Sequence, residues 1–292
     1  MQIELAWGRW RRWYLKRFRR GYVRRMEALR QGEPEGCPHE VLDPRDLKFC
    51  RNRAGYWWSE EDDPFRWRDR LPFARAGLAE LVLFTGLFLA LGVGLGWIYW
   101  PLAAIPAVLA VFVVSFFRDP RREVPAGPGL AVAPADGKVV SVEEVDHDEF
   151  IGGPAVVIGI FLSVFNVHIN RVPMAARVIG LTYRRGKFLN ALRTESAREN
   201  EQMAVRLEED EAPYRRMIVR QIAGAIARRI VCWVRPGDEL PRGAQFGMIK
   251  FGSRTELVLP REPGLVIEVK PGDKVRAGRS VMARFSGSKE IP

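Results

Sequence analysis

A glycine followed by a serine, Gly252-Ser253, lies between two strand-like stretches near the C-terminal end of the chain. This pair alone is a weak signal, but two upstream motifs supply a candidate base, His168, and a candidate group to orient it, Asp136. Attack by a hydroxyl needs both kinds of group. Glycine before the serine leaves the attacked carbonyl unhindered and tolerates unusual dihedral angles. The combination predicts a chain that cuts itself between Gly252 and Ser253.

Self-cleavage at this bond would turn the serine into a carbonyl cofactor. Attack of the Ser253 hydroxyl on the preceding carbonyl shifts the acyl group from nitrogen to oxygen, and elimination of the ester leaves a dehydroalanine. Hydration and loss of ammonia then give a pyruvoyl group. Such a ketone forms a Schiff base with a primary amine and acts as an electron sink, so an α-carboxylate can leave as carbon dioxide. We therefore expect a pyruvoyl-dependent decarboxylase.

The composition favours an anionic partner. The chain has 292 residues and a formal net charge of +11, which fits nucleic acid, anionic lipid or an acidic small substrate. The three cysteines, Cys37, Cys50 and Cys232, show no CxxC spacing. This scattered set argues against a disulfide framework or a zinc site. We expect no metal.

The uncharged stretch from 81 to 117 points to a membrane. As one helix its 37 residues would rise roughly 55 Å, well beyond a hydrocarbon core of about 30 Å. Pro101, beside Trp and Tyr residues near the middle, divides it into two helices near 78–97 and 101–117. We expect a membrane-associated helical hairpin over 77–118. A buried helical pair in a soluble core is the alternative.

The flanks of this hairpin are basic, which places the rest of the chain on the cytoplasmic face of the cell membrane. In front, residues 7–30 interleave arginines with aromatic residues. That pattern is typical of a solvated amphipathic helix, an interfacial segment or a nucleic-acid arm. The apolar hairpin that follows favours the interfacial segment, which contacts lipid. We expect no nucleic-acid partner. Residues 1–76 are interpreted as a basic, Trp-rich accessory extension.

Residues 119–292 are predicted to form the catalytic domain, in an α+β fold that is mainly β, compact and rich in hairpins. Short apolar runs at 139–142, 155–161, 178–183 and 217–222 indicate strands. The polar stretch 191–209 is predicted to be a loop or a short helix.

An internal repeat relates residues 234–243 to residues 269–278. Each copy contains a Pro-Gly-Asp turn and a second glycine, which permit the backbone conformations of tight turns. Similar hairpins occur in biotinyl- and lipoyl-carrier domains, but no lysine here has the Met-Lys-Met context of a carrier. The repeat is expected to frame a compact β-fold and to hold Gly252-Ser253 between its copies.

Four motifs together resemble those of phosphatidylserine decarboxylase proenzymes of the short bacterial and archaeal branch. They are Phe116-Phe117-Arg118-Asp119-Pro120, Pro134-Ala135-Asp136-Gly137, Asn166-Val167-His168-Ile169-Asn170-Arg171-Val172-Pro173 and Phe251-Gly252-Ser253-Arg254. The resemblance covers about residues 80–285. It implies self-cleavage into a large chain 1–252 and a small chain 253–292, which stay together as a heterodimer. It also implies a covalent pyruvoyl group derived from Ser253 and conversion of phosphatidylserine to phosphatidylethanolamine.

The chain departs from the longer branch of that family at one position. The longer branch carries a second histidine three residues after the first, where this chain has Arg171. That histidine is assigned there to self-cleavage, so two assignments stay open: His168 serves both steps, or Arg171 and water assist. Asn166 and Arg171 are the candidate substrate-binding residues.

Three other functions fit parts of the sequence. They are a decarboxylase of an archaeal-type serine phospholipid, a non-enzymatic membrane-anchored carrier-like β-domain, and a basic nucleic-acid binder. A non-enzymatic domain would stay intact, whereas the self-processing enzyme would be found as two chains. Lys250 is expected to matter little.

Overall fold

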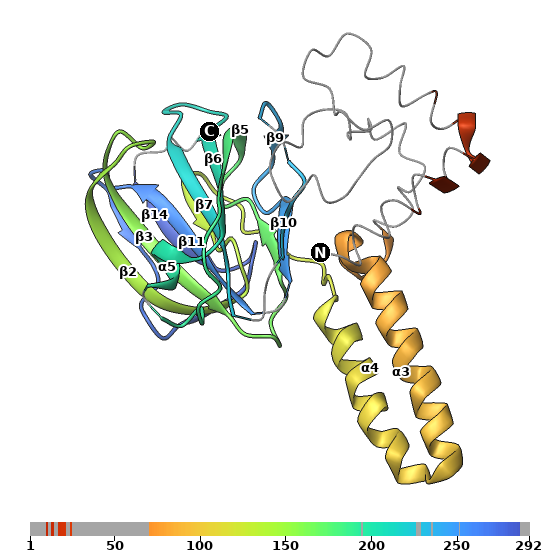
Figure 1. Cartoon of the computed structure of the whole chain (residues 1–292). Helices are drawn as coiled ribbons and strands as arrows, with labels where there is room; N and C mark the ends of the chain where they lie inside the picture. Colours follow the sequence, from red (N-terminus) through yellow and green to blue (C-terminus); the bar gives the residue numbers. More distant parts are fainter. Residues whose placement is uncertain are drawn as a thin grey trace.

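The computed structural model describes residues 10, 13–14, 17–21, 24, 70–193, 195–225, 229–234, 236–250 and 252–286. The predicted accessory extension 1–76 therefore lies almost entirely outside the described residues. Figure 1 shows two parts, a β-rich domain and a helical hairpin that projects from it. The prediction of a mainly β domain is confirmed.

The hairpin consists of α3 (Leu78–Ile98) and α4 (Ala104–Phe116), joined by a short 3-10 helix, η4 (Trp100–Ala103). Pro101 lies in the first turn of η4, where its missing N–H costs no hydrogen bond. The segment Arg75–Ile98 is long and apolar enough to cross a membrane on length and composition alone, and only 6% of its most apolar stretch is buried within the protein. The second helical segment, Trp100–Phe116, is shorter. That this hairpin contacts a membrane remains a prediction.

The strands of the described residues form three antiparallel sheets. The large sheet has the order β13-β2-β3-β11-β7-β6-β5-β9, and the small sheets have the orders β4-β10-β8 and β1-β14-β12. The strands are β1 (Leu130–Val132), β2 (Gly137–Asp148), β3 (Gly153–Leu162), β4 (Ile169–Arg171), β5 (Ala176–Arg184), β6 (Gln202–Glu209), β7 (Arg216–Ala223), β8 (Arg229–Cys232), β9 (Glu239–Leu240), β10 (Gln245–Lys250), β11 (Ser253–Pro260), β12 (Leu265–Ile267), β13 (Lys274–Val275) and β14 (Val281–Phe285).

The four predicted strands are confirmed as β2, β3, β5 and β7. The prediction for 191–209 was incomplete, because the short helix α5 (Ser196–Glu199) is followed by the strand β6. In β6 the fully buried Met203, Val205 and Leu207 alternate with more polar residues. This two-residue period marks a strand with one face in the core.

The internal repeat supplies both edges of the large sheet. Residues 239–240 form β9 and the equivalent residues 274–275 form β13, at opposite ends of the strand order. The hydrogen bonds repeat as well. The Val178 N–H donates to the carbonyl of Asp238, and the Val178 carbonyl accepts from the Gly237 N–H. Val139 makes the same two hydrogen bonds with Asp273 and Gly272. The repeat thus frames the sheet, with β11 between its two copies.

A second apolar cluster joins the hairpin to the domain. Phe116 and Phe117 at the end of α4 are about 1% exposed and pack against Val167, Ile169 and Met248 from the β4-β10 region. Burying an aromatic side chain of this size stabilises the structure by about 1.5–3 kcal/mol. The base of the hairpin is therefore part of the folded domain, next to β4 and β10.

Candidate self-cleavage site

The Gly252–Ser253 bond lies where the chain passes from one sheet to another. The strand β10 ends at Lys250 in a small sheet, and β11 begins at Ser253 in the middle of the large sheet. Between them Gly252 has a φ of +59°, a left-handed conformation that side chains disfavour. The glycine of the predicted cleavage pair is therefore required by the backbone of this link.

The hydroxyl of Ser253 is buried and lacks a partner. Ser253 pairs with Leu162 of β3 and Ala223 of β7, and its side chain is fully buried. Among the described residues its Oγ has no hydrogen-bond partner. An unpaired buried hydroxyl costs about 1–3 kcal/mol, so its presence is informative. Here it leaves the Oγ free to react with the adjacent carbonyl.

His168 is held as a neutral base beside this bond. Its Nε2 accepts a hydrogen bond from the Gly252 N–H at 3.2 Å. Its Nδ1 lies 2.9 Å from the carbonyl oxygen of Asn166, which can only accept, so Nδ1 carries the proton. Burial lowers the pKa of His168 to about 4, with a smaller contribution from the Arg118 charge. The lone pair of Nε2 therefore faces the backbone next to Ser253.

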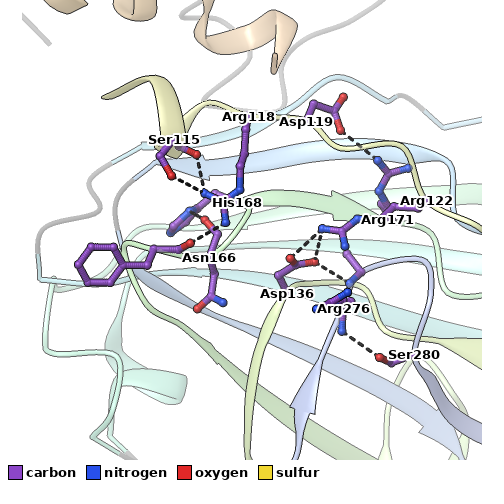
Figure 2. Close-up of polar contacts among 12 residues, drawn as sticks. Ser115, Arg118, Asp119, Arg122, Asp136, Asn166, His168, Arg171, Arg276 and Ser280 are labelled. Carbon is purple, nitrogen blue, oxygen red and sulfur yellow. Dashed lines mark hydrogen bonds and ion pairs between the residues drawn. The ribbon is translucent and has the colours of Figure 1, made fainter. Parts of the chain in front are cut away.

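The end of α4 lies next to the imidazole, and Figure 2 shows Ser115 and Arg118 beside His168. The ring of Phe116 lies against it, with 4.5 Å between centroids and 34° between planes. Arg118 donates to the Ser115 carbonyl and hydroxyl and to the carbonyl of Phe165, in the turn that precedes His168. The hairpin thus contributes one wall of the site.

Asp136 occupies a different cluster from the one we predicted. Its carboxylate accepts hydrogen bonds from Arg122, at 2.8 and 2.9 Å, and from the Ala277 N–H at 2.8 Å. The ring of His168 is oriented instead by the Asn166 carbonyl. Asp136 therefore holds the second copy of the repeat against the turn before β2, and a direct role for it in the reaction remains a prediction.

The two candidate substrate-binding residues are engaged within the protein. The Asn166 side chain accepts from the N–H and the hydroxyl of Ser163, closing the turn before His168. Arg171 donates to Asp119 at 3.1 Å and to the Gly243 carbonyl at 3.0 Å. Burial lowers the pKa of Arg171, and the negative charge of Asp119 opposes that shift. Binding of substrate by either residue remains a prediction, and these contacts give the pair structural roles.

Gly224, which the sequence analysis did not single out, lies against the predicted cleavage bond. A Cβ atom at this position would lie 2.4 Å from the carbonyl oxygen of Gly252. Only a glycine allows the chain after β7 to approach the scissile carbonyl so closely. The only signal in the sequence was the glycine itself. Its contact with the Gly252 carbonyl could not be predicted without the order of the strands in the sheet.

We expect Gly224→Ala to slow self-cleavage by about 100-fold, because the new methyl group must displace the scissile carbonyl and small misplacements are costly. The ratio of cut to uncut chain on a denaturing gel, followed after synthesis in vitro, measures this. Gly153→Ala is the matched control, since a Cβ there meets nothing within 4 Å. Equal cleavage of the two variants would contradict the assignment.

The chain has two other histidines. His147 is exposed on β2, and His39 lies outside the described residues. Within the described part of the chain, no group of three or more His, Cys, Asp or Glu could hold a metal ion.

A glycine in a left-handed conformation, an unpaired serine hydroxyl and a neutral imidazole beside one peptide bond are the features expected of a proenzyme that processes itself. The comparisons with known proteins name the particular family. The family model described as phosphatidylserine decarboxylase matches residues 109–283. The chain belongs to the phosphatidylserine decarboxylase family.

Three curated relatives, each named phosphatidylserine decarboxylase proenzyme, support this membership. The protein from Rhodopirellula baltica is 56% identical over 239 residues, which cover 82% of this chain and 99% of that protein. The protein from Symbiobacterium thermophilum is 46% identical, with 69% and 92% covered. The protein from Syntrophus aciditrophicus is 41% identical, with 73% and 97% covered. The match to nearly the full length of these relatives disfavours the non-enzymatic alternatives.

Proposed function

We propose that the chain converts its own Ser253 into a pyruvoyl group and uses it to decarboxylate phosphatidylserine to phosphatidylethanolamine. The observation that carries this proposal is the buried, unpaired hydroxyl of Ser253 beside a neutral His168. A hydroxyl at this point is next to the one carbonyl it must attack, and a base already contacts the N–H of Gly252, the residue that carries this carbonyl.

In the first step His168 Nε2 takes the proton of the Ser253 hydroxyl as Oγ attacks the Gly252 carbonyl carbon. To do so, Nε2 exchanges its present partner, the Gly252 N–H, for the hydroxyl. The Asn166 carbonyl stabilises the imidazolium that forms, because Nδ1 already donates to it. The hydroxyl oxygen of Ser253 leaves with Gly252 as part of its new carboxylate, and the nitrogen of Ser253 leaves as ammonia.

The pyruvoyl group that results supplies an electron sink for loss of carbon dioxide from an amino acid head group. The protein keeps it at the start of β11, between β3 and β7. His168 remains beside it and can return a proton to the substrate carbon. The enclosing wall from Phe116 excludes water from this side of the imidazole.

We place the enzyme at the cytoplasmic face of the cell membrane, bound through the hairpin. The support is chemical: apolar side chains cover the outside of α3 and α4, and Trp97, Tyr99 and Trp100 are exposed at the tip. Aromatic residues of this kind favour the membrane interface. The basic residue Arg121 follows α4 and is exposed, so it can face anionic headgroups.

Intact mass of the purified protein, followed by an activity assay, tests the proposal. We expect two chains, residues 1–252 and residues 253–292, and a small chain lighter than an N-terminal serine chain by one ammonia. An amine with borohydride should modify the small chain alone. Vesicles containing phosphatidylserine should release carbon dioxide, and an archaeal-type serine lipid serves as the comparison substrate. A single chain, or a small chain that begins with unmodified serine, would overturn the proposal.

A further inference from the structure

An ion pair ties the first turn of α3 to the end of β10. The Lys250 ammonium group contacts the carboxylate of Glu80 and donates to the Ala76 carbonyl at 3.1 Å. Arg229 contacts the same carboxylate at 3.4 Å. The Lys250 side chain is only 5% exposed and that of Glu80 is 27% exposed. Such a pair is partly shielded from water, which strengthens the attraction between its charges.

The location of these groups connects them with the scissile bond. Lys250 is the last residue of β10, two positions before Gly252, and Arg229 is the first residue of β8. The two lie opposite each other in the β10-β8 register. Glu80 therefore clamps the ends of two neighbouring strands at the point where the chain leaves the small sheet for the cleavage site.

Removing the charge of Glu80 would take away the carboxylate that both cations contact. The repulsion between Lys250 and Arg229 would then be less well balanced, so the end of β10 would shift. Gly252 is attached two residues further on, and its N–H and carbonyl must stay in register with His168 and Gly224. The carboxylate of Glu80 thus controls the placement of the reacting atoms without touching them.

We propose that Glu80 is a positioning residue for self-cleavage, so that the helix that projects from the domain also sets the geometry of the bond to be cut. This inference rests on the proposed self-cleavage. It assigns to α3 a role in maturation besides its proposed role as an anchor. It also reverses the expectation that Lys250 matters little.

Charge and shape can be separated with two pairs of variants of the full chain, followed by a time course of cleavage after synthesis in vitro. Glu80→Gln keeps the shape and removes the charge, and we expect cleavage to slow by about 10- to 100-fold. Glu80→Asp keeps the charge and should retain most of the rate. Lys250→Met removes the positive charge and should slow cleavage as Glu80→Gln does. Lys250→Arg keeps the charge and should retain most of the rate. Glu239→Gln is the matched control, because it breaks an exposed ion pair, with Arg177, far along the large sheet.

A second measurement separates positioning from general damage to the fold. The decarboxylation rate per cleaved chain of Glu80→Gln should stay within about threefold of the chain with the original sequence, because the bond that Lys250 and Glu80 position no longer exists after cleavage. Unchanged cleavage in Glu80→Gln, or an equal loss in Glu80→Asp, would overturn the inference. Absence of cleavage in the chain without any substitution would instead overturn the proposed function.

Discussion

Ser253→Ala should leave the chain uncut, at its full 33.3 kDa, and without decarboxylase activity. Alanine removes the only atom of this residue that can attack the Gly252 carbonyl, and with it the oxygen that leaves with the large chain. The fold should survive, because the lost hydroxyl makes no hydrogen bond within the described residues. A denaturing gel and an assay for released carbon dioxide measure both effects.

Two further variants sharpen this test. Ser280→Ala removes a hydroxyl that accepts from the Arg276 N–H in a turn and should cleave normally. Ser253→Thr retains a hydroxyl and should cleave in part, since only the added methyl group opposes the reaction in this tightly packed strand. Normal processing of Ser253→Ala would contradict the assignment of the cleavage site.

His168→Ala should slow self-cleavage by about 100- to 10,000-fold, the usual contribution of a general base. It should also abolish turnover in any chain that is cut, because the same imidazole is then missing from the mature site. The time course of cleavage and the activity per cleaved chain report the two effects separately. His147→Ala is the matched control, since that histidine is exposed on β2. Persistent activity in His168→Ala would show that another group acts as the base.

The pH dependence of cleavage gives an independent check on His168. The neutral imidazole is the active form, and burial lowers its pKa to about 4. The cleavage rate of the unmodified chain should therefore be flat near neutral pH and fall only as the pH drops through about 4. Phe116→Ala admits water to the ring, so it should move this fall to higher pH. The Arg118 charge, which also lowers the pKa, is retained in that variant.

Much of the fold could be predicted from local patterns. Apolar runs marked β2, β3, β5 and β7, and the repeat marked both edges of the large sheet. The strand β6 was missed because its buried apolar residues alternate with Ala204, Arg206 and Glu208, in a segment that is polar overall. Periodicity, and not average polarity, carried that information.

The site was predictable to the extent that its chemistry depends on residue type. Gly252, Ser253 and His168 come together as the motifs suggested. The partners of Asp136 and the closeness of Gly224 to the scissile carbonyl depend on pairings between segments far apart in the chain. No local pattern encodes which side chain or backbone group will lie opposite another, so these contacts required the structure. The same holds for the contact of Lys250 with Glu80.

The strand that begins at Ser253 lies between β3 and β7, and hydrogen bonds from both neighbours hold it along its length. After the proposed cut at the bond before it, these hydrogen bonds would hold the small chain in the enzyme, although no covalent link would remain. Unfolding then becomes a dissociation, so its midpoint should rise with protein concentration, whereas that of the uncut chain should not. Recovery after heating would require two separate polypeptides to find each other again, which makes maturation a step that the folded protein takes once.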